Sequence, residues 1–156
     1  MSAMATTTPR WLTDTEQYTW RRLMAMQRHL FDALDRQLTA DSGIPHAYYL
    51  ILAMLSEAPE RSLRMTELAA LTNSSQSRLS HAVARLEEAG WVRRARCATD
   101  KRGQTASLTE AGYEVLVAAA PGHVAAVRET LFDRLTPEQV HQLAEICTAV
   151  LERPAD

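Results

Sequence analysis

Cysteine is scarce, because only Cys97 and Cys147 occur among 156 residues, and this excludes a disulfide framework. No charged-then-apolar signal segment is visible, and no run of 18 apolar residues occurs, so we expect a cytoplasmic protein with no membrane partner. The five histidines lack metal-ligand spacing, and the sequence has no glycine-rich phosphate loop, nucleophile elbow or HExxH motif. We therefore expect neither an enzyme nor a cofactor.

Charge is unevenly distributed along the chain. The composition, 46% hydrophobic and 23% charged, fits one globular domain or two merged subdomains. The formal net charge of −2 would by itself argue against a nucleic-acid partner. Residues 62–104, however, include eight basic and four acidic residues, a net charge of +4, whereas the remainder has nine basic and fifteen acidic ones, a net charge of −6. A basic module between acidic flanks favours local binding of nucleic acid.

Hydrophobic periodicity predicts helices at both ends of the chain. Thr13 and Glu16 have capping-box spacing, and apolar residues then repeat at three or four positions in one long helix that Gly43 ends. Pro45 can start a second helix, and Pro59 ends it. Thr109 caps a helix that runs towards Asp133, and the last helix starts at Thr136.

Pro121 lies inside the helix that follows Thr109. Proline cannot donate a backbone hydrogen bond, and it disfavours helical geometry at the preceding residue. We therefore expect a kink or break between Ala119 and Gly122, which would act as a hinge.

Two consecutive helices in the middle of the chain have the pattern of a helix-turn-helix. The first is short, with Thr66 as its predicted cap, and Leu68, Ala69 and Leu71 are expected to face inward. The turn 72–74 leads into a second helix that Ser74 or Ser75 caps. Its apolar residues recur at helical spacing and predict a buried stripe. They are Leu79, Ala82, Val83 and Leu86.

The opposite face of this second helix combines small hydrogen-bonding side chains with arginines. Small residues allow close approach to a major groove, and Gln and Arg match the hydrogen-bonding edges of bases. A solvated polar face is the alternative for an isolated helix. The predicted DNA-binding residues of the helix are Ser75, Gln76, Ser77, Arg78, Ser80, His81 and Arg85.

A basic hairpin follows directly. Two short strands are predicted at 91–97 and 104–108, with a polar turn at 99–103. A narrow A·T-rich minor groove attracts guanidinium groups, and Asp100 is close enough in sequence to orient Arg102 there. An ordinary charged turn is the alternative. The predicted DNA-binding residues of this wing are Arg94, Arg96, Asp100, Lys101 and Arg102.

A series of motifs runs in order from residue 66 to 112. It comprises Glu67-Leu68-Ala69, Ser75-Gln76-Ser77-Arg78-Leu79-Ser80, Arg85-Leu86-Glu87, Gly90-Trp91-Val92, Arg94, Asp100-Lys101-Arg102-Gly103 and Leu108-Thr109-Glu110-Ala111-Gly112. This order resembles the MarR (multiple antibiotic resistance regulator) family of bacterial transcription factors, and residues 121–123 and 135–139 look like its subgroup common in high-GC actinobacteria. The resemblance implies a mainly α winged helix-turn-helix fold with a small β-hairpin wing and a helical dimerisation domain. It also implies a sequence-specific DNA-binding homodimer, usually a ligand-responsive repressor.

The terminal helices support the dimer independently. Both ends of the chain carry apolar stripes, and no central element is available to cover both sets, although an intramolecular bundle is the alternative. We predict a helical dimerisation domain at 11–45 and 110–152 and a winged helix-turn-helix DNA-binding domain at 46–109. Twofold symmetry would place two recognition helices about 34 Å apart on double-stranded DNA and imply a pseudo-palindromic operator.

Effector and sensing sites are a further question. Trp20, Met24, Tyr48 and Tyr49 are candidates to line a pocket for a small aromatic or phenolic effector, with plain core packing as the alternative.

The cysteines and histidines raise two more sensing hypotheses. Cys147 is expected in the core, while Cys97, near arginines, is better placed to react. A regulatory metal at His123 or His141 is weighed against ordinary structural histidines, and no metal site is predicted. The alternatives to a DNA-binding repressor are a winged-helix protein-interaction module without DNA binding and a cysteine redox-sensing regulator.

Overall fold

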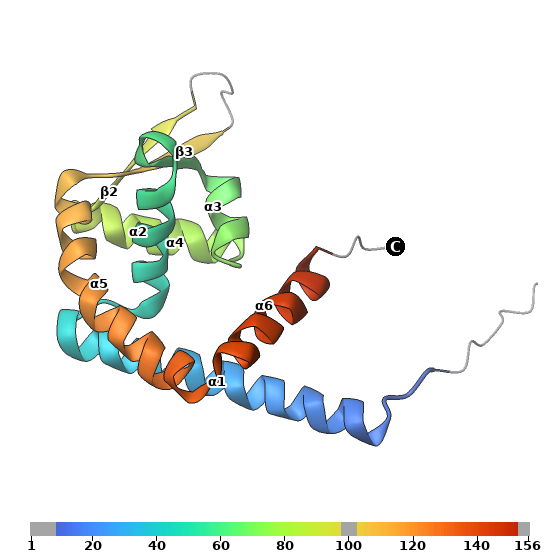
Figure 1. The fold of residues 1–156 in the computed structure, drawn as a ribbon. Coiled ribbons are helices and arrows are strands. Elements are labelled where there is room, and N and C mark those ends of the chain that lie inside the picture. Colours follow the sequence, from blue (N-terminus) through green and yellow to red (C-terminus); the bar gives the residue numbers. More distant parts are fainter. Residues whose placement is uncertain (1–8, 98–102, 153–156) are drawn as a thin grey trace, which may run out of the picture.

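The computed structural model describes residues 9–97 and 103–152. Helices dominate, with one small antiparallel sheet, as Figure 1 shows, and the predicted fold class is confirmed. The elements are α1 (Asp14–Ser42), α2 (His46–Glu57), β1 (Ser62–Arg64), α3 (Met65–Leu71), α4 (Gln76–Glu88), β2 (Val92–Arg96), β3 (Gln104–Leu108), α5 (Glu110–Thr130) and α6 (Pro137–Leu151), with 3-10 turns at Pro59–Arg61 and Phe132–Arg134.

Most helix ends follow the capping chemistry of the sequence. The Glu16 N–H donates to the Thr13 hydroxyl at 3.2 Å, and the Thr13 N–H donates to the Glu16 carboxylate at 2.8 Å, which completes the predicted capping box. Gly43 ends α1 in the left-handed conformation, with φ of 67°. Ser75, Thr109 and Thr136 cap α4, α5 and α6.

Two predictions for α3 are wrong. The helix begins at Met65, so Thr66 lies in its first turn, and the Arg64 N–H at the helix start donates instead to the Glu67 carboxylate at 3.2 Å. Leu71 is 56% exposed rather than turned inward. In a helix of seven residues only about two turns exist, and Met65, Leu68 and Ala69 form its buried side.

The sheet has three strands rather than the two predicted. Its order is β1-β3-β2, all antiparallel, and β3 in the centre pairs Ala106 with Leu63 on one side and Arg94 on the other. Ala106 is fully buried there. β1 ties the segment before α3 to the hairpin, so the wing and the helix-turn-helix share one sheet.

Most of the core lies inside the winged module formed by α2 to β3, and Leu38 of α1 and Leu116 and Ala119 of α5 join it from outside. Leu52 and Leu55 of α2 are fully buried, as are Leu68 of α3 and Val83 of α4. Leu79 and Leu86 complete the predicted stripe of α4, with Ala82 half-buried beside it. One apolar cluster therefore holds α4 against α2 and α3.

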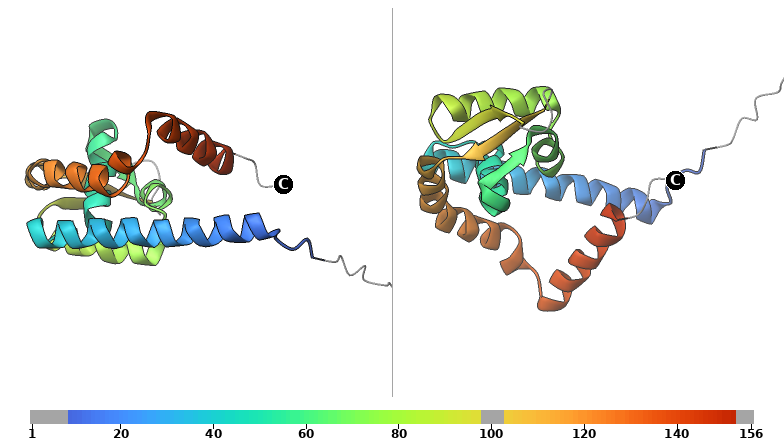
Figure 2. Two further views of the ribbon diagram at one scale, coloured as in Figure 1. Left: turned by 60° about the horizontal axis from the view of Figure 1, so that its bottom comes forward. Right: turned by 90° about the horizontal axis from the view of Figure 1, so that it is seen from above.

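Helices α1, α5 and α6 form a frame outside the module. In Figures 1 and 2, α1 extends well beyond the module and α6 leads away from it. Only Leu34 and Leu38 of α1 are buried, and no residue of α6 is buried. The prediction that Cys147 is a core residue is wrong for the single chain, because Cys147 on α6 is exposed.

Helix α5 runs without a break through Pro121. Of the predicted kink or break between Ala119 and Gly122, the break is therefore wrong, while Figure 1 shows that the axis of α5 bends along its length. By length and composition, Glu110–Arg134 is the one described segment that could cross a membrane. This is weak evidence, since α5 packs along α1 and α2 and buries Leu116 and Ala119.

Gly112, in the first turn of α5, is where that helix approaches the module most closely. A Cβ there would meet the Trp91 backbone carbonyl and would lie 2.8 Å from Leu108 Cδ1. We expect Gly112→Ala to destabilise the fold by about 1–3 kcal/mol or more, since backbone cannot move aside cheaply.

Chemical denaturation of this variant checks that expectation, with Gly122→Ala as the matched control. A Cβ at Gly122 would meet only side-chain atoms, Gln37 Nε2 at 3.0 Å and Asp41 Oδ2 at 3.3 Å, which can move. Equal stability of both variants would show that the contact between Trp91 and α5 is not tight.

Candidate nucleic-acid interface

Helix α4 presents a polar face at its amino-terminal end. Ser75 caps the helix, and its hydroxyl accepts from the Arg78 N–H at 3.2 Å. The buried stripe turns the other side to solvent, so most of the predicted base-reading residues are exposed. The exposed ones are Ser75, Gln76, Ser77, Arg78, His81 and Arg85. Arg85 already pairs with Glu88 at 3.0 Å, and both of these side chains are more than half exposed.

Ser80 and Arg94 are placed differently from the other predicted contacts. Arg94 Nε donates to Glu87 at 2.7 Å, and its Nη1 donates to the Ser80 hydroxyl at 3.2 Å. The two side chains therefore join α4 to β2, within the protein, instead of facing outward like Arg78.

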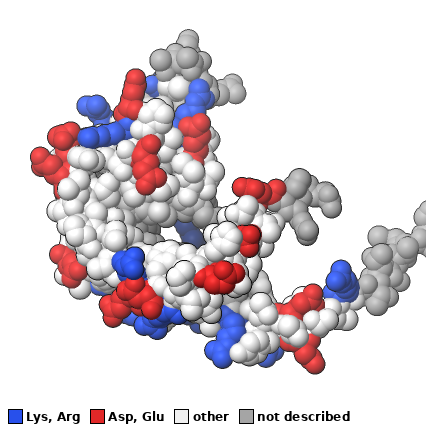
Figure 3. Space-filling view, viewed as in Figure 1, with Lys and Arg blue, Asp and Glu red and all other residues white. Residues whose placement is uncertain are grey.

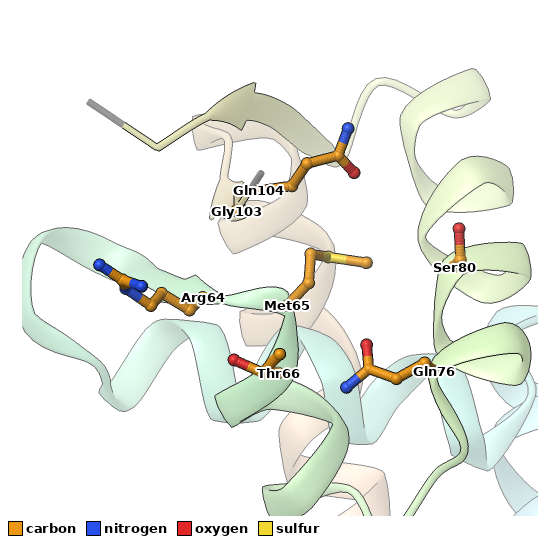
Figure 4. A pocket seen from close by; sticks show the side chains of 7 residues that line it. All are labelled: Arg64, Met65, Thr66, Gln76, Ser80, Gly103 and Gln104. Atoms are coloured by element: carbon orange, nitrogen blue, oxygen red, sulfur yellow. The ribbon is translucent and has the colours of Figure 1, made fainter. Parts of the chain in front are cut away.

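A hollow of about 400 Å³ lies between α4 and the hairpin, and Figure 4 shows its lining. Gln76 from α4 extends towards the start of α3, and Gln104 from β3 lies above the hollow. Gln104 and Thr66 were not predicted from the sequence as site residues. Neither belongs to a periodic pattern, and β1, which brings the start of α3 beside β3, was not recognised.

The strand alternation of β2 divides its arginines between two faces. Residues at even spacing share a face, so Arg94 and Arg96 lie on the side of the buried Val92, and Arg93 lies on the other side. Arg96 is exposed, two residues closer to the tip than Arg94. Figure 3 shows basic side chains beside the base of the wing, interspersed with acidic ones. Asp100, Lys101 and Arg102 lie outside the described residues.

The four candidate effector residues do not line one cavity in the single chain. Trp20 and Met24 border a shallow hollow of about 330 Å³ on α1. Tyr48 borders another, of about 440 Å³, between α2 and α4, together with Arg78 and His81. Tyr49 is buried, 7% exposed, and packs on His123 with ring centres 4.3 Å apart.

Two histidines meet where α1, α2 and α5 join. The rings of His46 and His123 are 5.7 Å apart, and Phe31 of α1 lies 5.7 Å from His46. Burial lowers the pKa of both imidazoles. Asp35 opposes this effect at His46, whereas His46 reinforces it at His123. Burial, and then the Glu57 carboxylate, raises the pKa of Tyr49.

Metal ligation finds no support in the geometry of this cluster. Across residues 9–97 and 103–152, no three His, Cys, Asp or Glu side chains gather as a metal site. His141 forms only a 3.5 Å contact with Glu145 on exposed α6.

A family model and two similar solved structures name the same family. A family model described as the MarR family matches residues 42–103. Sco3205, a MarR family transcriptional regulator from Streptomyces coelicolor solved in complex with DNA, is 57% identical over 95% of this chain and 94% of that one, with a TM-score of 0.88. AbsC, a MarR family regulator from the same organism, is 42% identical over 92% and 97%, with a TM-score of 0.84. The transcriptional regulator BldR from Sulfolobus solfataricus is 26% identical over 87% and 96%, with a TM-score of 0.74. No curated protein matches the sequence.

The histidine pair predicts an acid-sensitive fold. In the unfolded chain an imidazole takes up a proton near pH 6.5, whereas the folded chain resists protonation until lower pH. The unfolded state therefore binds more protons in this window, so the free energy of unfolding falls as the pH drops below about 6.5.

We expect His123→Phe, which keeps a ring but cannot be protonated, to reduce this loss. Urea denaturation at about pH 7.5 and about pH 5.5, at fixed protein concentration, measures it. Exposed His29→Gln is the control and should lose as much stability as the unmodified chain. An unchanged acid loss in His123→Phe would contradict the assignment.

Proposed function

The chain belongs to the MarR family of transcriptional regulators, and we propose that it binds a pseudo-palindromic operator as a homodimer and represses a nearby gene until a small molecule binds. The arrangement of α4 beside the hairpin is the observation that carries this proposal. The capped, exposed amino-terminal half of α4 lies next to a basic wing, and this arrangement belongs to a chain similar along almost its whole length to a regulator solved with DNA.

We assign base reading to the exposed face of α4. Gln76, Ser77, Arg78 and His81 project from its first two turns, as a helix in a major groove requires. The N–H groups that open the helix favour a phosphate next to Ser75. Arg85 and Arg96, both exposed, are suited to phosphate contacts on either side.

The tip of the wing remains a prediction from sequence. We propose that Arg102 enters the minor groove with Asp100 as its orienting carboxylate and Lys101 beside it. A guanidinium in that position would add a preference for A·T pairs at the flanks of each half-site.

The unpartnered apolar residues of the frame support the dimer. Trp11, Trp20, Ile146, Val150 and Leu151 are between 53% and 82% exposed, a costly arrangement for an isolated chain in water. We propose that a second copy covers them, and that 11–45 and 110–152 form the dimerisation domain while 46–109 form the DNA-binding domain. The regulator would then act without catalysis, in the cytoplasm where the chromosome lies.

We propose that an aromatic or phenolic effector acts near Tyr48. The hollow beside Tyr48 also borders Arg78 and His81, so an occupant there would contact the residues assigned to DNA. Trp20 and Met24, on α1, and Tyr49, which packs on His123 of α5, do not border this hollow in the single chain.

Selection from a random DNA library tests the proposed function. We expect a twofold-symmetric site whose half-sites are about 34 Å apart, one turn of DNA. Arg78→Ala should weaken binding by about 1–3 kcal/mol per half-site at one base position if Arg78 reads a base, or weaken all sequences alike if it holds phosphate.

Two outcomes would favour the alternatives. Recovery of no sequence would point to a winged-helix module without DNA binding, and unchanged binding by Arg78→Ala would show that the α4 face is misassigned. Loss of binding under peroxide, absent from a variant lacking Cys97, would favour the redox regulator.

Sedimentation tests the dimer. We expect the unmodified chain to sediment as a dimer at micromolar concentration, and Ile146→Glu to sediment as a monomer because a carboxylate would be buried in the interface. Thr148→Glu, about 200° further around α6, is the matched control. A stable monomer for the unmodified chain, or a dimer unaffected by Ile146→Glu, would contradict the assigned interface.

A further inference from the structure

We propose that Glu87, Arg94 and Ser80 form a clasp that fixes the angle of the wing against α4, and that Arg94 is a positioning residue rather than a DNA contact. The inference rests on the proposed function, because the angle matters only if the helix and the wing bind the same DNA. It also revises the sequence-based assignment of Arg94 and Ser80 as DNA-binding residues.

Arg94 makes three hydrogen bonds across the joint. Its backbone N–H donates to Glu87 Oε1 at 2.9 Å, its Nε donates to Glu87 Oε2 at 2.7 Å, and its Nη1 donates to Ser80 Oγ at 3.2 Å. Ser80 and Glu87 are seven residues apart on α4, about 10 Å along the axis. One strand residue thus restrains the helix at two points about two turns apart, and this resists rotation as well as separation.

Burial distinguishes this ion pair from the others nearby. The Arg94 and Glu87 side chains are 24% and 30% exposed, compared with 59% and 67% for Arg85 and Glu88 on the same helix. Exposed pairs contribute little because water screens them and their side chains remain mobile. A shielded pair joined by two hydrogen bonds, with a third from Arg94 to Ser80, holds its geometry, and charge-assisted bonds are the stronger kind.

The hairpin needs such a restraint at this position. β1 pairs with β3 only from Thr105 to Ser107, so the pair formed by Arg96 and Gln104 belongs to a two-stranded ribbon. Two-stranded ribbons twist strongly and are marginal alone. Arg94, opposite the buried Ala106, is two residues before Arg96 and therefore lies at the base of the free part.

A fixed angle affects DNA binding through preorganisation. If α4 enters a major groove, the wing must meet the adjacent minor groove without a separate loss of conformational freedom on binding. Losing the clasp should therefore weaken the wing contact selectively, while base reading by α4 continues.

The central test is Glu87→Gln, measured on the selected operator. The amide keeps an oxygen for the Arg94 N–H but offers Nε a donor instead of an acceptor, and it makes the protein more positive. We expect about tenfold weaker operator binding, the scale of one charge-assisted hydrogen bond, and a smaller slope of log K against log salt, because the basic residues of the wing lose their contacts with DNA. We also expect hydroxyl-radical protection to disappear at the flanks and to persist at the centre of each half-site.

Further variants separate positioning from contact. Arg94→Gln should lower the salt slope by the same amount as Glu87→Gln, whereas an arginine that itself neutralised a phosphate would lower it by about 0.9 per copy while Glu87→Gln left it unchanged. The exchange Glu87→Arg with Arg94→Glu should restore flank protection, although it places a carboxylate where a DNA contact would need a cation. Ser80→Ala should loosen the flanks slightly and leave the preferred central bases unchanged.

Controls match each substitution. Glu110→Gln removes a carboxylate that pairs with Arg61 at 3.1 Å, away from α4, and should keep flank protection. Arg93→Gln removes a charge from the opposite face of β2 and should also keep it. Thermal melting confirms that each variant is folded at the binding temperature.

The outcomes distinguish the clasp from the function on which it rests. Absence of specific binding by the unmodified chain overturns the proposed function. Specific binding by the unmodified chain, together with tighter binding by Glu87→Gln or a salt slope that falls in Arg94→Gln but not in Glu87→Gln, overturns the clasp alone. If the exchanged pair does not fold, the single variants and their salt slopes still decide.

Discussion

The buried stripe of α4 determines which side chains of this helix are exposed and able to contact DNA. Leu79, Val83 and Leu86 pack into the cluster formed with α2 and α3, and this packing fixes the rotation of the helix about its own axis. Arg78 and His81 are exposed as a consequence, and Ser80 and Glu87 face the hairpin. A rotation of α4 by one residue, about 100°, would replace Leu79 and Leu86 in the core by Ser80 and Glu87 or by Arg78 and Arg85, so apolar packing sets the chemistry of the outer face.

Features governed by local chemistry were predictable from the sequence. Thr13, Ser75, Thr109 and Thr136 cap helices because hydroxyl side chains satisfy backbone N–H groups that have no partner inside the helix. The stripe of α4 and the two hairpin strands follow from simple periodicities. β1 was missed because three residues cannot show an alternation. Thr66 was assigned wrongly as the cap of α3, because the Glu67 carboxylate accepts from the Arg64 N–H and the helix therefore begins at Met65.

Features governed by distant partners were not predictable in the same way. The periodicity of α6 identifies an apolar side but not what covers it, so Cys147 was assigned to a core that the single chain does not form. Pro121 predicts a lost hydrogen bond, yet α5 continues because packing along α1, where Gln37 and Asp41 approach Gly122, holds the helix on both sides of the proline. Tertiary contact outweighs the local penalty in this case.

The arginines show most clearly where reasoning from composition ends. Residues 62–104 have a net charge of +4, but Arg85 and Arg94 are paired with Glu88 and Glu87, so the sum does not say which cations face DNA. Arg94 and Arg96 share a face of β2. Arg94 lies beside the last turns of α4 and pairs with Glu87, whereas Arg96, two residues further along the strand, is exposed. The same charge therefore has two uses two residues apart. Because a clasped arginine orders the wing before DNA arrives, its contribution to affinity would be conformational and would depend on Glu87 as much as on its own charge, unlike that of Arg96.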